Sequence, residues 1–268
     1  MSRLKTTNTP DLQALLTPMT ARNPVTLAVE RALMRGHDCS APVAEQIAVR
    51  LAGLIAVDVI HAGQRLLEAD ISRVLGVSRA PVREALRILE RERLVEFRAR
   101  RGAIVTAPNE HDLRCIYVVR EALYAILLRE LMENRPEDLE ALLAQKLPQV
   151  ARAAAESADA YASESFLANL AMTDLSSNRL TTDLLNSISL RTLRYVRLGL
   201  AANPDMVEDL LDTWWALHHA ISKRDIDAVL QTAQRRIEDS RDAAVRTLLQ
   251  PVPGQQRRLR QVRPVAVR

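Results

Sequence analysis

Three arginines recur at every fourth position near residue 80, namely Arg79, Arg83 and Arg87. In an α-helix a step of four residues drifts by only about 40°, so the three guanidinium groups share one stripe of the surface. Guanidinium groups donate paired hydrogen bonds to phosphate oxygens and to the O6 and N7 atoms of guanine. The spacing is therefore typical of a helix that contacts DNA, although an ordinary solvated face would show the same pattern.

The residues on either side of this stripe offer groups of the same kind. Ser78 is predicted to be the N-cap of the helix, and the free N–H groups of the first turn favour a phosphate. Beyond the helix an Arg-Gly pair lies in a tight turn, where arginine can reach DNA and glycine permits a close approach. We therefore expect a DNA-binding site made of Ser78, Arg79, Ala80, Arg83, Arg87, Arg101 and Gly102.

The elements that must position these side chains follow from the hydrophobic periodicity. Helices are predicted over residues 42–58, 68–75 and 78–93, and Gly76 is expected to end the second helix in a left-handed conformation. Two short β-forming runs follow at residues 94–98 and 103–106, and the turn between them predicts a hairpin. Three helices followed by a hairpin predict a winged helix-turn-helix, whose third helix enters the major groove.

The rest of the chain is predicted to be helical almost throughout, so the fold class is mainly α. Short connections between the helices predict an antiparallel all-α bundle. The helices are expected near residues 110–134, 136–156, 159–175, 180–200, 205–223 and 225–248. The predicted organisation is a flexible N-terminal extension (1–41) with a short amphipathic helix at 24–35, the winged helix-turn-helix (42–108), the helical domain (109–248) and a basic disordered tail (249–268).

The charge distribution and the composition indicate which classes of protein are compatible with this sequence. The net charge of the 268 residues is +4, but residues 43–109 are basic, residues 110–247 are acidic, and the tail carries arginines without acidic residues. This asymmetry is compatible with a polyanion-binding module joined to a domain of another function. Cys39 and Cys115 form neither a disulfide framework nor a metal-ligand spacing. Without a signal peptide or a membrane-length apolar run, we expect a cytoplasmic protein with no membrane partner.

Three segments of the first half resemble the GntR family of bacterial regulators over about residues 43–108. They are AEQIAVRLAGLI, EADISRVLGVSRAPVREALRILERERLV and RRGAIVTAP. The resemblance implies that Arg79 and Arg83 contact bases or phosphates, that Ser78 contacts a phosphate, and that Gly102 lies close to DNA. The sequence departs from the family pattern at two positions. It has Ala69 in place of a common DNA-reading arginine, and Arg93 in place of a glycine that usually precedes the wing.

The second half resembles the FCD domain of the FadR-like subgroup over about residues 110–247. The similar segments are VVREAL at 118–123, SSN at 176–178 and HAISKRD at 219–225. The resemblance implies a homodimer in which a bound ligand moves the paired DNA-binding modules. It also implies that Arg120 faces the ligand cavity. Residues 109–248 are therefore expected to form a dimerisation and effector domain.

Many such domains bind a divalent metal through one aspartate and three histidines. The corresponding positions hold Ser165, Asn169, Trp214 and Arg236, none of which is a good metal ligand, so we predict no metal and no cofactor. One hypothesis is that Arg120 and Arg236 hold an organic anion directly, with Trp214 as a wall. The alternative is that these side chains fill the core or form an internal ion pair. The predicted effector-binding residues are Arg120, Asn169, Trp214 and Arg236.

Three functions follow from these patterns. The first is a sequence-specific transcriptional regulator, a repressor, that binds double-stranded DNA as a homodimer on a pseudo-palindromic operator and responds to a small organic acid. The second is a DNA-binding regulator that is constitutive or controlled by a protein partner. The third is an all-α enzyme with an appended nucleic-acid-binding module. The sequence has no Gly-rich phosphate loop, no supported Ser/His/Asp arrangement and no spaced His/Glu set, so we do not expect an enzyme.

Overall fold

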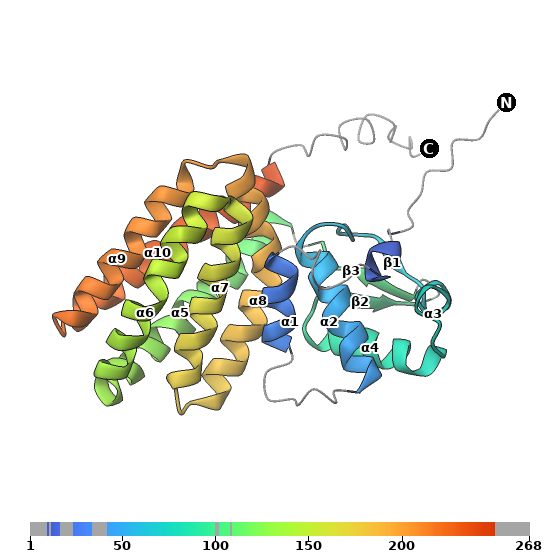
Figure 1. The fold of residues 1–268 in the computed structure, drawn as a ribbon, viewed down its shortest axis with the longest axis horizontal. Helices are drawn as coiled ribbons and strands as arrows, with labels where there is room; N and C mark the ends of the chain where they lie inside the picture. Colours follow the sequence, from blue (N-terminus) through green and yellow to red (C-terminus); the bar gives the residue numbers. More distant parts are fainter. Residues whose placement is uncertain are drawn as a thin grey trace, which may run out of the picture.

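The structure is a computed structural model that describes residues 10, 12–16, 24–33, 42–99, 102–107 and 109–249. A small domain with a three-stranded sheet lies beside a larger helical bundle (Figure 1). The mainly helical fold class is confirmed. Arg101 and most of the predicted tail, from residue 250 onward, lie outside the described residues.

The small domain contains three helices: α2 (Val43–Ala56), α3 (Glu68–Leu75) and α4 (Arg79–Arg91). Helix α3 ends at Gly76, whose φ of 65° confirms the predicted left-handed cap. One side of α4 is fully buried because its apolar residues recur at helical spacing. These are Val82, Ala85, Leu86 and Leu89. Burial of this side directs the arginine stripe toward solvent.

The predicted hairpin is confirmed by strands β2 (Val95–Arg98) and β3 (Gly102–Val105), which pair antiparallel. A further strand, β1 (Arg65–Leu66), pairs with β3 and gives the sheet order β1-β3-β2. The sequence did not predict β1, because two residues are too few to show an alternating pattern. Gly102 opens β3 with a φ of 75°, a conformation that residues with a Cβ rarely adopt.

The bundle confirms the six predicted helices, each boundary within about two residues of its expected position. They are α5 (Glu110–Asn134), α6 (Pro136–Glu156), α7 (Ala158–Leu175), α8 (Arg179–Ala202), α9 (Met206–Ser222) and α10 (Ile226–Leu249). Asn109 caps α5 through a reciprocal pair of hydrogen bonds with Asp112, at 2.9 and 3.2 Å. No helix in the part of the chain that the structure describes is both long and apolar enough to span a membrane.

Helix α1 (Pro24–Leu33) lies between the two domains and packs against α2 and α7 (Figure 1). Val25, Ala28 and Val29 on this helix are fully buried. Residues 24–33 are thus the predicted amphipathic helix, and they form part of the folded body although they fall within the predicted flexible extension. Gly53 of α2 permits the close approach, because a Cβ there would lie 2.6 Å from Cγ2 of Thr26.

The two domains share one apolar core. Buried side chains of α2 and α4 belong to the same cluster as Phe166 and Leu170 of α7 and Leu190 of α8. Polar contacts reinforce the docking, since Arg194 pairs with Asp58 and Arg197 donates to the carbonyl of Ala56 over 3.1 Å. The small domain and the helical bundle are therefore held together by packing as well as by the chain connection.

Candidate nucleic-acid interface and ligand cavity

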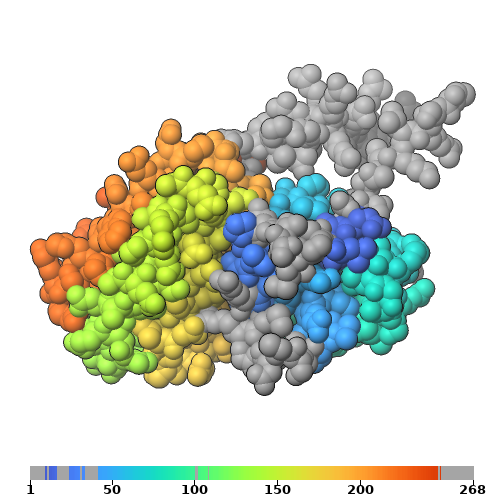
Figure 2. All heavy atoms as spheres, in the orientation of Figure 1, coloured from blue at the N-terminus to red at the C-terminus, as the bar shows by residue number. Residues whose placement is uncertain are grey.

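The structure places the predicted residues of α4 on one exposed surface. Ser78, Arg79, Ala80, Arg83 and Arg87 are all solvent-exposed. Helix α3 lies at the end of the small domain that faces away from the bundle, and Figure 2 shows it at the surface there. Helix α4 packs against α3, and its last residues approach the bundle. The stripe is thus presented at the free end of the small domain, where a long polyanion can approach.

The start of α4 has the backbone of a helix N-terminus without a side-chain cap. Ser78 occupies the N-cap position with an extended backbone, as predicted, but its hydroxyl accepts no hydrogen bond from the first turn. The predicted N-cap position is confirmed, and the hydroxyl of Ser78 leaves the N–H groups of the first turn free. The first turn contains no acidic residue, so the positive end of the helix dipole is not neutralised there. Such an end favours an anion.

Arg83 is paired with a residue that the sequence analysis missed. Its Nε and Nη2 atoms donate to the two carboxylate oxygens of Glu68 over 2.9 and 2.8 Å. These hydrogen bonds hold the pKa of Glu68 below its ordinary value, and the nearby charges of Arg79 and Arg87 act in the same direction. Glu68 lies 15 positions earlier in the chain and on another helix, so no local spacing rule connects the two.

The wing contributes a glycine at the predicted position. Gly102 adopts its left-handed conformation beside β1, where a Cβ would lie 3.8 Å from the carbonyl oxygen of Leu66. Arg98 at the end of β2 is partly neutralised, because it pairs with Glu96 at 2.5 Å. Arg101, the remaining predicted wing residue, lies outside the described residues.

A second site lies inside the helical bundle. A cavity of about 40 Å³ is lined by Arg120, Asn169 and Arg236, together with Tyr161, Ser165 and Thr192. Arg120 donates to Oγ1 of Thr192 over 2.9 Å, and Arg236 donates to Oδ1 of Asn169 over 3.4 Å. The structure thus brings together three of the four predicted effector-binding residues around one space.

Trp214, the fourth predicted residue, lies behind Arg236 and not on the cavity wall. The guanidinium carbon of Arg236 lies 3.4 Å from the centroid of the Trp214 ring, a stacking that fixes the direction of the arginine. Trp214 is itself fully buried, and its Nε1 donates to Oγ of Ser165 over 3.2 Å. The indole therefore acts as a support for Arg236.

The cavity carries positive charge that nothing nearby balances. Among the described residues no carboxylate pairs with Arg120 or Arg236, and the Nε atom of each has no hydrogen-bond partner. Burial, reinforced by the charge of Arg236, lowers the pKa of Arg120. A buried cation without a counter-ion costs several kcal/mol by rough estimate, so an anion entering the cavity gains that energy back.

The residues at the family's metal positions are engaged with one another. Ser165 accepts from Trp214, and Asn169 accepts from both Arg236 and Tyr124, the latter over 3.1 Å. Within the described ranges no cluster of three or more His, Cys, Asp or Glu residues is arranged to hold a metal ion. What the site offers is guanidinium and amide groups, which bind carboxylates rather than cations.

Residues 43–105 match the family profile of the bacterial regulatory proteins of the gntR family, and residues 115–239 match the FCD domain. The chain belongs to the GntR family. The arginine stripe on α4 lies in the first matched region, and the Arg120–Arg236 cavity lies in the second.

Two curated relatives match the N-terminal part of this GntR-family chain. An uncharacterised HTH-type transcriptional regulator, YdhC of Bacillus subtilis, is 30% identical over 91 residues, which is 34% of this chain and 41% of the relative. The gluconate operon transcriptional repressor of B. subtilis is 35% identical over 94 residues, 35% of this chain and 38% of the relative. The match thus spans about two fifths of each relative.

Among solved structures, E. coli McbR/YncC is similar with a TM-score of 0.67 at 18% identity. The similarity covers 78% of this chain and 100% of that chain. At this identity the likeness shows the fold alone: a winged helix-turn-helix joined to an FCD-type bundle. The GntR-family fold is therefore supported over both halves of the molecule.

Proposed function

We propose that this GntR-family protein is a sequence-specific DNA-binding transcriptional repressor. The observation that carries the proposal is the division of α4 into a buried apolar side and an exposed side with Arg79, Arg83 and Arg87. An uncapped positive helix end adjoins that stripe. Major-groove readers of this type dock the N-terminal part of the third helix on base edges.

A reporter assay tests the direction of regulation. A reporter gene is placed behind the protein's own upstream region, and expression is compared with the wild-type protein and with an Arg79→Ala/Arg83→Ala variant. A repressor lowers expression, and the double variant restores it at equal protein level. Expression that rises with the wild-type protein would identify an activator instead.

We propose further that the functional form is a homodimer that binds a pseudo-palindromic operator. Large apolar side chains are exposed on two neighbouring helices of the bundle: Val118, Val119 and Ile126 on α5, and Leu180 and Leu184 on α8. Light scattering tests the proposal. Dimer mass for the wild type and monomer mass for Val119→Glu/Ile126→Glu support it, and a wild-type monomer at micromolar concentration contradicts it.

The bundle cavity is proposed to bind a small organic acid. Its support is the pair of guanidinium groups, Arg120 and Arg236, that face one cavity without a carboxylate partner among the described residues. A volume of about 40 Å³ holds only a few water molecules, so the ligand is a short carboxylate or the cavity opens to admit it. Binding is then expected to depend on both arginines.

Calorimetric titration with acetate, lactate and succinate tests this site. Arg120→Met and Arg236→Met should abolish binding, whereas the exposed arginines on the same helices, Arg129 and Arg235, serve as matched controls when changed to Met. Equal binding by all four variants would overturn the assignment. Absence of binding to the wild type would favour the alternative, a constitutive or partner-controlled regulator, which the small volume of the cavity also suggests.

A further inference from the structure

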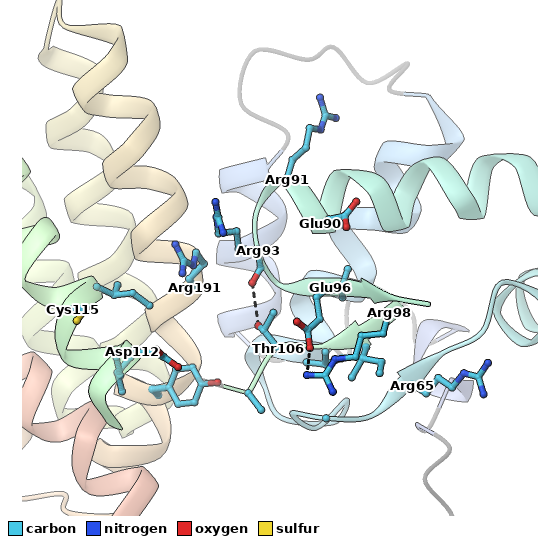
Figure 3. A pocket seen from close by; sticks show the side chains of 18 residues that line it. Arg65, Glu90, Arg91, Arg93, Glu96, Arg98, Thr106, Asp112, Cys115 and Arg191 are labelled. Carbon is cyan, nitrogen blue, oxygen red and sulfur yellow. Dashed lines mark hydrogen bonds and ion pairs between the residues drawn. The ribbon is translucent and has the colours of Figure 1, made fainter. Parts of the chain in front are cut away.

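A cleft separates the DNA-binding domain from the helical bundle. Its volume is about 1220 Å³, and its walls come from the end of α4 and strands β2 and β3 on one side and from α5 and α8 on the other. Figure 3 shows Arg93, which follows α4, next to Arg191 of α8. The cleft therefore brings one arginine of each domain together in a space that is separate from the bundle cavity.

Of the five arginines that line this cleft, four form no salt bridge with a described residue. No carboxylate forms a salt bridge with them among the described residues, and Nε of Arg65 is buried without a hydrogen bond. These side chains are Arg65, Arg91, Arg93 and Arg191. An open cleft in which unpaired arginines outnumber the paired one attracts anions from solution.

The acidic side chains of the same cleft are already engaged. Glu96 pairs with Arg98, and Asp112 accepts from the backbone N–H of Asn109 in the α5 cap. Glu90 accepts from the backbone N–H of Phe97 over 3.4 Å. The carboxylates that line the cleft are therefore directed to other groups and form no salt bridge with Arg65, Arg91, Arg93 or Arg191.

Arg93 and Arg191 are close enough to act on one another. The pKa of Arg191 is lowered, first by burial and then by the positive charge of Arg93, while Glu92 opposes this effect. Arg93 also has a φ of 53°, a left-handed conformation that favours glycine. Arg93 thus occupies a backbone position that favours glycine and lies near a second cation, Arg191. An anion bound between the two guanidinium groups would stabilise this arrangement.

We propose that this cleft is a binding site for a small metabolite with two or more phosphoryl groups, held between Arg93 and Arg191. Phosphoryl oxygens accept the paired N–H groups of guanidinium, and two guanidinium groups can share one such anion. The volume exceeds that of a single phosphate and suits a ligand of nucleotide size. Because each domain supplies one arginine, the bound anion cross-links the DNA-binding domain to the bundle.

The test is isothermal titration calorimetry of the full chain with tripolyphosphate, with ionic strength held constant by sodium chloride. Arg93→Ala and Arg191→Ala should each raise the Kd at least tenfold. Arg152→Ala changes an exposed arginine on α6 that does not line the cleft, and it should leave the Kd unchanged. Arg191→Met keeps an apolar side chain at the half-buried position of Arg191. A Kd raised as much by Arg191→Met as by Arg191→Ala therefore shows that the loss of charge, and not the loss of packing, weakens binding. Unchanged melting temperatures confirm that the variants fold.

Two results would overturn the proposal. The first is a tripolyphosphate Kd that is the same for the wild type, Arg93→Ala and Arg191→Ala. The second is the absence of tripolyphosphate binding to the wild type at the fixed ionic strength. If the tripolyphosphate Kd is unchanged and both variants lose affinity for random duplex DNA, the two arginines are assigned to the backbone of a nucleic acid.

Discussion

Arg83 of α4 donates two hydrogen bonds to the carboxylate of Glu68 on α3, over 2.9 and 2.8 Å. The pair uses Nε and one N–H of Nη2, so the opposite edge of the guanidinium, formed by its two terminal nitrogens, still has donors to offer. Guanine presents two acceptors, O6 and N7, in the major groove. We infer that Glu68 positions Arg83 for a base and does not merely compete for it.

Replacing Arg83 should weaken specific binding more than nonspecific binding. For Arg83→Ala we expect a loss of about 1–3 kcal/mol per half-site on the operator, the range for one bidentate base contact. Fluorescence anisotropy with operator and random duplexes measures both affinities, with Arg152→Ala as the control. An equal loss on both duplexes would make Arg83 a phosphate contact.

Glu68→Gln should show separately how Glu68 affects DNA binding by positioning Arg83 and by carrying a negative charge. The amide no longer holds the guanidinium firmly, so operator affinity should fall by about 0.5–1.5 kcal/mol, the net value of a typical hydrogen bond. Removal of a negative charge near the DNA should at the same time leave affinity for random DNA unchanged or raise it. The same pair of titrations measures this split. Higher affinity for both duplexes would show that Glu68 only competes for Arg83.

The pH dependence of this pair has a defined sign. Arg83 lowers the pKa of Glu68 from its ordinary value, so the pair's contribution to stability is fully present above the ordinary carboxyl pKa. It is lost as the pH falls through the lowered pKa. Ionisation of Glu68 should therefore not change the ratio of operator affinity to random-DNA affinity between about pH 5.5 and 8. A Glu68-dependent change inside that window, absent in Glu68→Gln, would contradict the pairing.

Much of the DNA-binding half could be predicted from the sequence, because its helices and turns are specified by residues that lie close together in the chain. The periodicity of Val82, Leu86 and Leu89 gives the buried side of α4, and the exposed stripe follows from the same helical geometry. The partnership of Arg83 with Glu68 could not be predicted, because it depends on how two helices pack. Strand β1 escaped prediction for a similar reason, since its two residues are defined by pairing with β3.

The bundle shows the same division between local and nonlocal information. Six helices followed from turn residues and periodicity, and the resemblance pointed to Arg120 and Arg236. Sequence alone could not show that Trp214 lies behind Arg236, or that the cavity measures about 40 Å³. The interdomain cleft was also beyond prediction, because Arg93 and Arg191 meet only through the docking of the two domains.

Arg236→Met should remove ligand binding without destabilising the protein. Removing a buried charge that has no counter-ion relieves a desolvation cost of several kcal/mol by rough estimate, and the lost stacking on Trp214 opposes this by about 2 kcal/mol. We expect an unchanged or higher free energy of unfolding in urea. Arg235→Met, at an exposed position, should change it by less than about 0.5 kcal/mol. A loss above 2 kcal/mol would make Arg236 a structural residue.

Gly53→Ala tests the docking of α1 on the DNA-binding domain. The new methyl group meets Cγ2 of Thr26 at 2.6 Å, and overpacking of this kind costs about 1–3 kcal/mol. The better helix propensity of alanine returns up to about 1 kcal/mol. We expect a net loss in thermal stability that Thr26→Ser, which lacks Cγ2, largely reverses in the double variant. Failure of this rescue would place the strain elsewhere.

The central claim is that the small domain reads a specific DNA sequence. It is tested by anisotropy titration against the protein's own upstream region and against random DNA over a range of salt concentrations. The account predicts tighter, dimer-stoichiometric binding to the upstream region, with log affinity falling by about 0.9 per phosphate neutralised for each unit of log salt. Equal affinity for both DNAs at every salt concentration would contradict specific recognition at this site and leave the arginine stripe as a general polyanion-binding surface.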